Sequence, residues 1–382
     1  MDFELSQEQR ELQAAAIEFA RAELNDRVIE RDAEKQFSHD GWKRCADFGV
    51  LRLPIPEEHG GSGADPVTTI AVMEGLGYGC RDQGLLFSIN AHLWTNSIPI
   101  LKYGTSDQIA KYLPGLCDGS LIGANGASEP GAGSDIFSMR TRVTRDGDSY
   151  VLNGSKIWVT NAPIADLFVV YGTLDPERGV LGICGFILEK DTPGLSVGGK
   201  LDKMGLRTSP MSEIYFKDCR IPLTARLGRE GFGAEVFNCS MAWERASILA
   251  TCLGTMRRQL ERCVEYARTR KQFGQPIGKF QSVANRIVDM QIRYETARLL
   301  LYKVGWLMQQ GKSTHLDAAM AKLYVSESFL SSCLDAVQVH GTAGYMTELE
   351  FERELRDAVG SRLYSGTSEI QRTIIAKQLL RV

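Results

Sequence analysis

The sequence lacks the long apolar segments that mark membrane proteins. No uninterrupted apolar run reaches the roughly 18 residues that a transmembrane helix needs. The N-terminal segment MDFELSQEQRELQ is acidic and polar, whereas a secretory signal needs a basic start and an apolar core. We therefore predict a cytoplasmic protein that has no membrane partner.

Paired cysteines and clustered histidines are also missing. The nine cysteines are scattered without a C-x-x-C pair, which is typical of reduced thiols in a reducing compartment. Cys239, Cys252, Cys263 and Cys333 lie in apolar helical patterns, so we expect them to be buried. The five histidines show no metal-ligand spacing, and we expect no metal site.

The sequence also lacks an excess of positive charge. Lys and Arg number 44 against 47 Asp and Glu, which gives a net charge of −3. A nucleic-acid-binding protein needs a basic face to neutralise phosphates, so no nucleic-acid partner is predicted. A hydrophobic content of 43% and a charged content of 24% are instead typical of a packed globular protein.

The hydrophobic pattern divides the chain into three regions. Residues 1–120 have helical periodicity, residues 121–230 have strand-like alternation, and residues 231–382 are helical again. We predict three domains with these boundaries, in which a β domain lies between two helical ones. The long helical patterns of the last region cover 233–270, 279–310, 314–340 and 367–380.

Two local signals refine this assignment. Ser6 followed three residues later by Gln9 is a capping box, which predicts that a helix begins here. In the β region, SYVLNGSKIWVTNA carries Asn153-Gly154, a pair that favours a hairpin turn.

Four segments have the composition of a ligand site, although each has a structural interpretation as well. NGASEPGAGSD (125–135) is rich in glycine, so its backbone can approach a ligand, or it is an interdomain turn. KIWVTNA places Trp158 on a strand, where tryptophan is usually core. ARTRKQFGQPIGKFQ ends a helix with cations that offset its dipole. The fourth segment is QVHGTAGY (338–345).

In this order, the four segments resemble those of the acyl-CoA dehydrogenase family, and the resemblance runs nearly end to end. It implies an N-terminal all-α domain, a middle β-barrel domain and a C-terminal four-helix bundle. It also implies FAD as cofactor and a homotetramer (or dimer). Thr342 departs from the family pattern, because a second glycine usually occupies this position.

The resemblance also assigns FAD-binding roles. In the family the first segment lines the flavin, and the Trp and Thr of the second contact its ring system. The third and fourth hold the pyrophosphate and adenosine across a subunit interface, where a bidentate guanidinium suits a pyrophosphate. By resemblance the FAD-binding residues are Asn125, Ala127, Ser128, Gly133, Ser134, Trp158, Thr160, Arg270, Phe273, Gln281, Gln338, Gly341, Thr342, Thr367 and Glu369.

The general base stands at an unusual position. Many family members carry it in a loop Tyr-Glu-Gly-Thr, but this chain has Ser365 there, and a serine hydroxyl is too weak a base for a thioester α-proton. A minority place the base before an Arg on a helix, as Glu244 precedes Arg245 in SMAWERASILA. We predict Glu244 as the base, with a pKa raised by apolar surroundings, although an arbitrary Glu is usually a solvated surface residue.

The loop sequence also bears on the substrate. The small Ser365 frees the volume of a carboxylate, which favours an acyl group that is branched or cyclic near the thioester. NAPIADLFVVYGT and LDKMGLRTSPM resemble the branch of the family that oxidises a prolyl thioester on a phosphopantetheinylated carrier protein. Its products are pyrroline- or pyrrole-2-carboxyl thioesters of antibiotic biosynthesis. By resemblance the substrate-binding residues are Ser134, Arg245, Tyr364 and Ser365.

Other interpretations stay open at this point. The alternatives are α,β-desaturation of a short branched-chain acyl-CoA, a flavin monooxygenase and a non-catalytic binding protein. The electron acceptor is either an electron-transfer flavoprotein or O2, and oxidation removes two or four electrons. Trp94 and Asn96 are further candidates for recognising the ring nitrogen. One helix face carrying Arg257, Arg258, Arg262 and Arg268 would suit an acidic carrier protein, or is simply solvated.

Overall fold

The computed structural model describes residues 4–381, and its first region is helical. The predicted capping box is confirmed, because the Ser6 hydroxyl accepts from the Gln9 amide at 3.1 Å while the Gln9 side chain accepts from the Ser6 amide at 3.0 Å. The helices of this region are α1 (Gln7–Glu23), α2 (Val28–Glu34), α3 (His39–Phe48), α4 (Pro66–Gly79), α5 (Gln83–His92), α6 (Ile98–Tyr103) and α7 (Ser106–Asp118).

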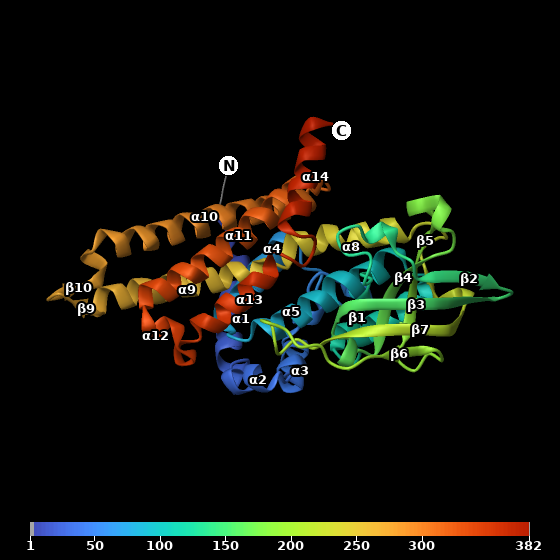
Figure 1. Cartoon of the computed structure of the whole chain (residues 1–382), viewed down its shortest axis with the longest axis horizontal. Helices are drawn as coiled ribbons and strands as arrows, with labels where there is room; N and C mark the ends of the chain where they lie inside the picture. Colours follow the sequence, from blue (N-terminus) through green and yellow to red (C-terminus); the bar gives the residue numbers. More distant parts are fainter. Residues whose placement is uncertain (1–3, 382) are drawn as a thin grey trace.

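The middle region is one mixed sheet with its own apolar core (Figure 1). Its strand order is β6-β7-β3-β2-β4-β5-β8, and β1 joins β4 in parallel. Alternate side chains of β3 and β7 point into this core, as the period of a strand requires. The strands are β1 (Gly123–Gly126), β2 (Arg142–Asp146), β3 (Ser149–Thr160), β4 (Leu167–Thr173), β5 (Ile183–Glu189), β6 (Leu195–Val197), β7 (Met211–Pro222) and β8 (Arg226–Leu227).

The turn predicted at Asn153-Gly154 is wrong. Both residues lie inside β3, and the hairpin between β2 and β3 closes instead after Asp146, which pairs with Ser149. Gly154 has φ +148 at a register shift in the pairing of β3 with β7. A side chain there would meet Thr141 at 2.8 Å. Glycine is therefore needed here for a bulge and for a close backbone approach. The dipeptide alone cannot distinguish this role from that of a turn.

The third region is helical, which confirms the predicted fold class of helices, β domain and helices. Figure 1 shows α9, α10 and α11 running side by side, with a small hairpin of β9 (Lys271–Gln272) and β10 (Gln275–Pro276) at their far end from the sheet. The single helical segment predicted over 233–270 is divided into two helices, and α13 was not predicted. The helices are α8 (Gly233–Ser247), α9 (Ala250–Thr269), α10 (Gln281–Gln309), α11 (His315–His340), α12 (Thr342–Tyr345), α13 (Phe351–Ser361) and α14 (Ser368–Leu380).

Helix α4 of the first region crosses α9 of the third with backbones almost in contact. An added Cβ at Gly77 would lie 2.0 Å from the Thr251 carbonyl, and one at Gly254 would lie 2.1 Å from the Glu74 carbonyl. Only glycine allows this approach, so these two residues join the helical regions into a single core.

Membrane-spanning helices and metal clusters are both absent from residues 4–381. Within this range, no helix is long and apolar enough to span a bilayer. The same residues contain no group of three His, Cys, Asp or Glu arranged to hold a metal ion. Cys252, Cys263 and Cys333 are buried as predicted, while Cys239 is only partly buried, and all nine cysteines are free.

Candidate active site

Glu244 lies near the C-terminal end of α8 and is buried, with 8% of its surface exposed. Its Oε1 accepts a hydrogen bond of 2.7 Å from the Ser365 hydroxyl, while its Oε2 has no hydrogen-bond partner in the described chain. Beside it, the Trp243 ring stacks on Trp94 with centroids 5.8 Å apart. The carboxylate is therefore hydrogen-bonded at one oxygen and has no partner at the other among the described residues, and stacked aromatic rings lie beside it.

Burial dominates the proton affinity of this carboxylate. Loss of water raises the pKa of Glu244, and the Ser365 hydroxyl, Arg245 and Lys322 oppose the rise in that order. The net direction is upward. This matches the predicted raised pKa and is the direction that suits a general base working near neutral pH.

The loop that carries Ser365 is anchored from two helices. Arg245 of α8 donates from Nε to the Ser365 carbonyl at 3.3 Å. Gln371 of α14 donates from Nε2 to the same carbonyl at 3.1 Å and to the Gly366 carbonyl at 2.9 Å. Ser365 itself has φ +56, a conformation that a non-glycine residue adopts only when its surroundings enforce it. These contacts fix the hydroxyl against Glu244.

Replacing Ser365 by alanine is expected to raise the pKa of Glu244. The hydroxyl bond favours the ionised carboxylate, and a hydrogen bond to a charged group contributes about 1.5–3 kcal/mol, so the acid limb of flavin reduction should move up by about one pH unit. Rapid-mixing measurement of flavin reduction across pH 5–9 tests this.

The matched control for that variant is Ser326→Ala, which removes a buried hydroxyl bonded to the Leu323 carbonyl. Its pH profile should stay that of the parent protein. An acid limb that does not move in Ser365→Ala would mean that the hydroxyl bond is energetically neutral for the base.

The first two predicted FAD segments lie side by side and are joined by a buried ion pair. Lys156 of β3 donates from Nζ to Glu129 Oε1 at 2.7 Å and to the Ala127 carbonyl at 3.2 Å. Glu129 also accepts from the Thr141 hydroxyl at 2.6 Å. The Ile157 amide bonds to the Ser128 carbonyl at 2.9 Å. The pair thus holds the glycine-rich loop against the strand that carries Trp158.

Trp158 is not a core residue, so the structural interpretation of its strand is wrong. A register shift in the β3–β7 pairing spans its position, its φ is +58, and 55% of its surface is exposed. A Cβ added at Gly133 would lie 3.9 Å from the indole. Thr160, two residues on at the end of the strand, is half-buried. An open aromatic face beside a glycine and a hydroxyl fits the flat, hydrogen-bonding ring system of a flavin.

The other predicted FAD residues do not converge on this place within one chain. Arg270 and Phe273 lie on the β9–β10 hairpin, and the Phe273 side chain is 92% exposed. Gln281 begins α10, and Gln338, Gly341 and Thr342 lie exposed around the end of α11. Figure 1 places this group at the opposite end of the molecule from the sheet.

The residues around the loop fall between the two groups. Thr367 caps α14 by accepting from the Ile370 amide at 3.3 Å, and Glu369 is exposed in the first turn of that helix. The Tyr364 ring packs on Phe87 at 4.7 Å between centroids. Near the middle domain, Asn125 donates to the Thr95 carbonyl at 3.1 Å, while Ser134 is exposed.

The sequence suggested Trp94 and Asn96 as residues that recognise the ring nitrogen, but only Asn96 keeps a polar atom without a partner among residues 4–381. The Trp94 N–H already donates to Asn90 at 2.7 Å, so it has no free donor for a ligand. Asn96 is buried, and its carbonyl oxygen has no hydrogen-bond partner among residues 4–381.

Sequence reasoning missed Gln371 and Lys322, both buried near the loop. A lysine inside the apolar pattern AAMAKLYV was the available signal for the second.

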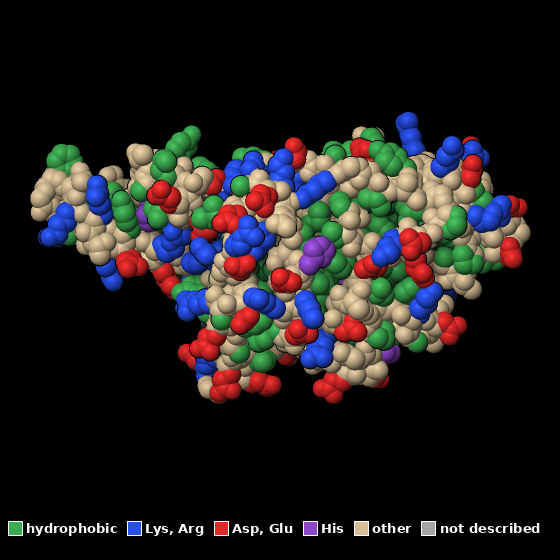
Figure 2. Space-filling view, turned by 90° about the horizontal axis from the view of Figure 1, so that it is seen from below, with side chains coloured by type: hydrophobic (Ala, Val, Ile, Leu, Met, Phe, Trp, Pro, Cys, Tyr) green, Lys and Arg blue, Asp and Glu red, His purple; other side chains and the backbone are tan. Residues whose placement is uncertain are grey.

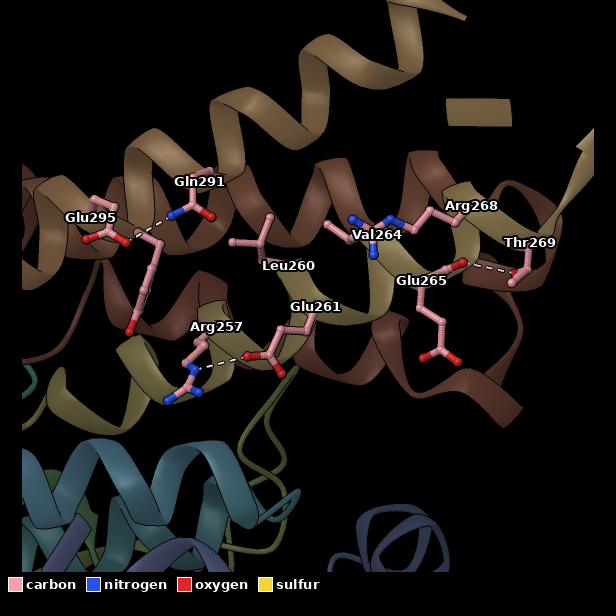
Figure 3. A pocket seen from close by; sticks show the side chains of 10 residues that line it. Arg257, Leu260, Glu261, Val264, Glu265, Arg268, Thr269, Gln291 and Glu295 are labelled. Carbon is pink, nitrogen blue, oxygen red and sulfur yellow. Dashed lines mark hydrogen bonds and ion pairs between the residues drawn. The ribbon is translucent and has the colours of Figure 1, made fainter. Parts of the chain in front are cut away.

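The predicted basic helix face is wrong. Arg258 turns inward to Glu354 at 2.9 Å, and Arg262 lies over the Phe351 ring at 4.0 Å. Only Arg257 and Arg268 line the groove of about 560 Å³ between α9 and α10 (Figure 3). Acidic side chains line the same groove, namely Glu261, Glu265 and Glu295. On the face shown in Figure 2, charges of both signs are also interspersed.

Family models match the chain in three successive parts. The acyl-CoA dehydrogenase N-terminal domain matches residues 6–120, the middle domain residues 124–219 and the C-terminal domain residues 231–380. An L-prolyl-(peptidyl-carrier protein) dehydrogenase of Serratia sp. (strain ATCC 39006) is 44% identical over 379 residues, covering 99% of this chain and 98% of the relative.

Solved structures give the same result. The prolyl acyl carrier protein oxidase AnaB is 49% identical with a TM-score of 0.97, covering 98% of this chain and 100% of its own. PigA with FAD and proline is 44% identical with a TM-score of 0.98, and the match covers 100% of both chains. The sequence and the backbone therefore match the same group of proteins over their whole length.

Proposed function

This chain belongs to the acyl-CoA dehydrogenase family, and from that premise we propose that it oxidises a prolyl group held as a thioester on a phosphopantetheinylated carrier protein, with FAD as cofactor. The observation that carries the chemistry is the buried Glu244 carboxylate with one oxygen free. The observation that carries the substrate is the full-length similarity to a prolyl-carrier dehydrogenase and to two prolyl-related structures.

The small Ser365 side chain beside Glu244 supports an acyl group that is compact or branched near the thioester. Behind Tyr364 lies a cavity of about 10 Å³, lined among others by Phe87 and Ile248. This cavity holds roughly one water molecule, and neither Glu244 nor Ser365 lines it, so it is separate from the place proposed for the acyl group. In this proposal the ring lies next to Ser365, with its α-carbon toward the Glu244 oxygen that has no hydrogen-bond partner among the described residues.

The chain's own residues then divide the work. Glu244 Oε2 accepts the α-proton, while Ser365 keeps Oε1 engaged and so orients the carboxylate. Arg245 holds the loop through the Ser365 carbonyl, and Ser134 contacts the pantetheine arm. Tyr364 closes the pocket against Phe87 and excludes water. The proton leaves to Glu244, and the hydride leaves from the atom next to the α-carbon.

FAD, when bound, would supply the acceptor for this hydride, that is, for two electrons and one proton. Trp158, Thr160 and the loop 125–134 would hold its ring system, because they form the open aromatic and glycine-lined face. Arg270, Phe273 and Gln281 would hold the adenosine diphosphate part of the FAD bound to a second copy, since they lie at the far end of their own chain (Figure 1). We infer a homotetramer, or at least a dimer, on this ground.

Anaerobic bleaching of the flavin tests the substrate. A prolyl-loaded carrier protein is expected to bleach FAD at its oxidised absorbance maximum within seconds, because kcat values of enzymes are typically about 1–10³ s⁻¹. Isovaleryl-CoA and the unloaded carrier should leave the spectrum unchanged. Mass analysis of the pantetheine arm then counts whether two or four electrons were removed.

The opposite result has a definite meaning. Bleaching by isovaleryl-CoA alone would make the protein a branched-chain acyl-CoA dehydrogenase, which uses the same base. Air or an electron-transfer flavoprotein is then added to the bleached sample. The one that restores the flavin colour is the electron acceptor.

A further inference from the structure

Lys322 of α11 is fully buried, and its ammonium has no hydrogen-bond partner among the described residues. Two other shielded lysines of the chain, in contrast, have hydrogen-bond partners. Lys156 pairs with Glu129 at 2.7 Å, and Lys203 donates to the Ser209 carbonyl at 2.6 Å. An unpartnered buried charge is unfavourable for folding. A buried ammonium that makes no hydrogen bond to any described residue points to a role outside packing.

The charges that face Lys322 come from three helices. Glu244 and Arg245 lie on α8, Glu327 lies on α11 itself, and Glu369 lies on α14. Burial and then Arg245 lower the pKa of Lys322 to about 8, while the three carboxylates act in the opposite direction. Its ammonium also lies 6.0 Å from the centre of the Tyr364 ring.

Of these three carboxylates, Glu244 is the one that is buried and has no ion pair within residues 4–381. Burial raises its pKa, and the charges of Arg245 and then Lys322 lower it. Glu327 already has Arg362 at 2.9 Å and the Ser368 hydroxyl at 2.6 Å. The Glu369 side chain is 74% exposed, so water screens its charge. Glu244 is buried without an ion-pair contact. Its neighbour Arg245 spends its Nε donor on the Ser365 carbonyl.

We propose that Lys322 is a positioning residue whose buried positive charge keeps the Glu244 carboxylate ionised before it accepts the substrate proton. The proposal rests on the proposed role of Glu244 as base. Arg245 is the other cation that acts on Glu244, and its Nε donates to the Ser365 carbonyl. The Ser365 hydroxyl and Tyr364 from the loop and Tyr171 from β4 are neutral. His315 faces Arg245 rather than the carboxylate.

The test compares Lys322→Met with Lys322→Arg in the FAD-loaded protein. Without the cation the acid limb of flavin reduction should rise by about one pH unit, the low end of the effect of a nearby opposite charge, so the rate below the midpoint falls about tenfold. Lys322→Arg keeps the charge and should restore the profile. Lys303→Met, which removes a half-exposed lysine paired with Asp317, is the control and should change nothing.

A second measurement needs no turnover. Infrared titration of the apoprotein, with Glu244→Gln as the subtracted reference, follows the carboxyl stretch of Glu244 directly. Lys322→Met should shift this titration upward by the same amount. Its unfolding midpoint should be unchanged or higher, because the variant removes an unpartnered buried charge.

The outcomes separate the two proposals. Loss of stability in Lys322→Met with an unmoved titration of Glu244 makes Lys322 a structural residue and overturns this inference. Full activity in Glu244→Gln instead overturns the role of Glu244 as base, on which this inference rests, whatever Lys322 does, and leaves the substrate assignment to the bleaching experiment. A parallel shift in the kinetic and infrared titrations, restored by arginine, supports the electrostatic role.

Discussion

Glu244→Gln is expected to bind FAD normally and to lose flavin reduction by about 10²–10⁴-fold, the usual contribution of a positioned general base. The amide has the size of the carboxylate and keeps an oxygen for the Ser365 hydroxyl, so the pocket keeps its shape. It has no basic oxygen for the α-proton. Single-turnover reduction with the substrate identified by bleaching measures the effect, and the flavin spectrum before mixing reports that the cofactor is in place.

Two companion variants sharpen this result. Glu235→Gln changes an exposed carboxylate in the first turn of the same helix and should leave the rate unchanged. Adding Ser365→Glu to Glu244→Gln should not restore turnover of a prolyl group, because the longer side chain fills the space that the ring needs. Native rates in Glu244→Gln alone would show that another group removes the proton.

Lys156→Met is expected to destabilise the protein by about 3–5 kcal/mol, the cost of leaving one partner of a buried ion pair alone. Lys156 is fully buried, and Glu129 is 6% exposed, so water cannot solvate the carboxylate that remains. Coulombic attraction and hydrogen bonding from Lys156 oppose the effect of burial and lower the pKa of Glu129, which shows the strength of their coupling. Denaturant unfolding followed by circular dichroism measures the loss.

The same variant should also weaken FAD retention, because the pair ties the glycine-rich loop to the strand of Trp158. The double variant with Glu129→Gln removes the orphaned charge, and we expect it to recover a large part of the lost stability. Lys190→Met breaks an ion pair with Asp166 whose lysine is 55% exposed, and it should change stability by less than about 1 kcal/mol. Equal losses in the buried and exposed variants would contradict the argument.

The sequence predicted much of the fold because its signals are local. Periodicity located most long helices, and the capping box located the start of α1 to the residue. It missed α13 because the charges of this helix are buried. Glu354, for example, is 1% exposed and is paired with Arg258 from α9. A charged side chain in a sequence predicts exposure unless its partner is known, and the partner lies 96 residues away.

The sequence by itself determined the fold class, the identity of the predicted base and the absence of a carboxylate at position 365. The order of helices, strands and helices follows from periodicity, the predicted base follows from the resemblance of short segments to a family, and the serine at position 365 is read directly. Only the tertiary structure decided that Ser365 donates to Glu244 across 121 residues, that Lys156 joins two segments of the site, and that Lys322 is buried unpaired. The physical reason is that periodicity reports which face of an element is apolar, whereas hydrogen bonds and buried charges depend on which distant element packs against that face.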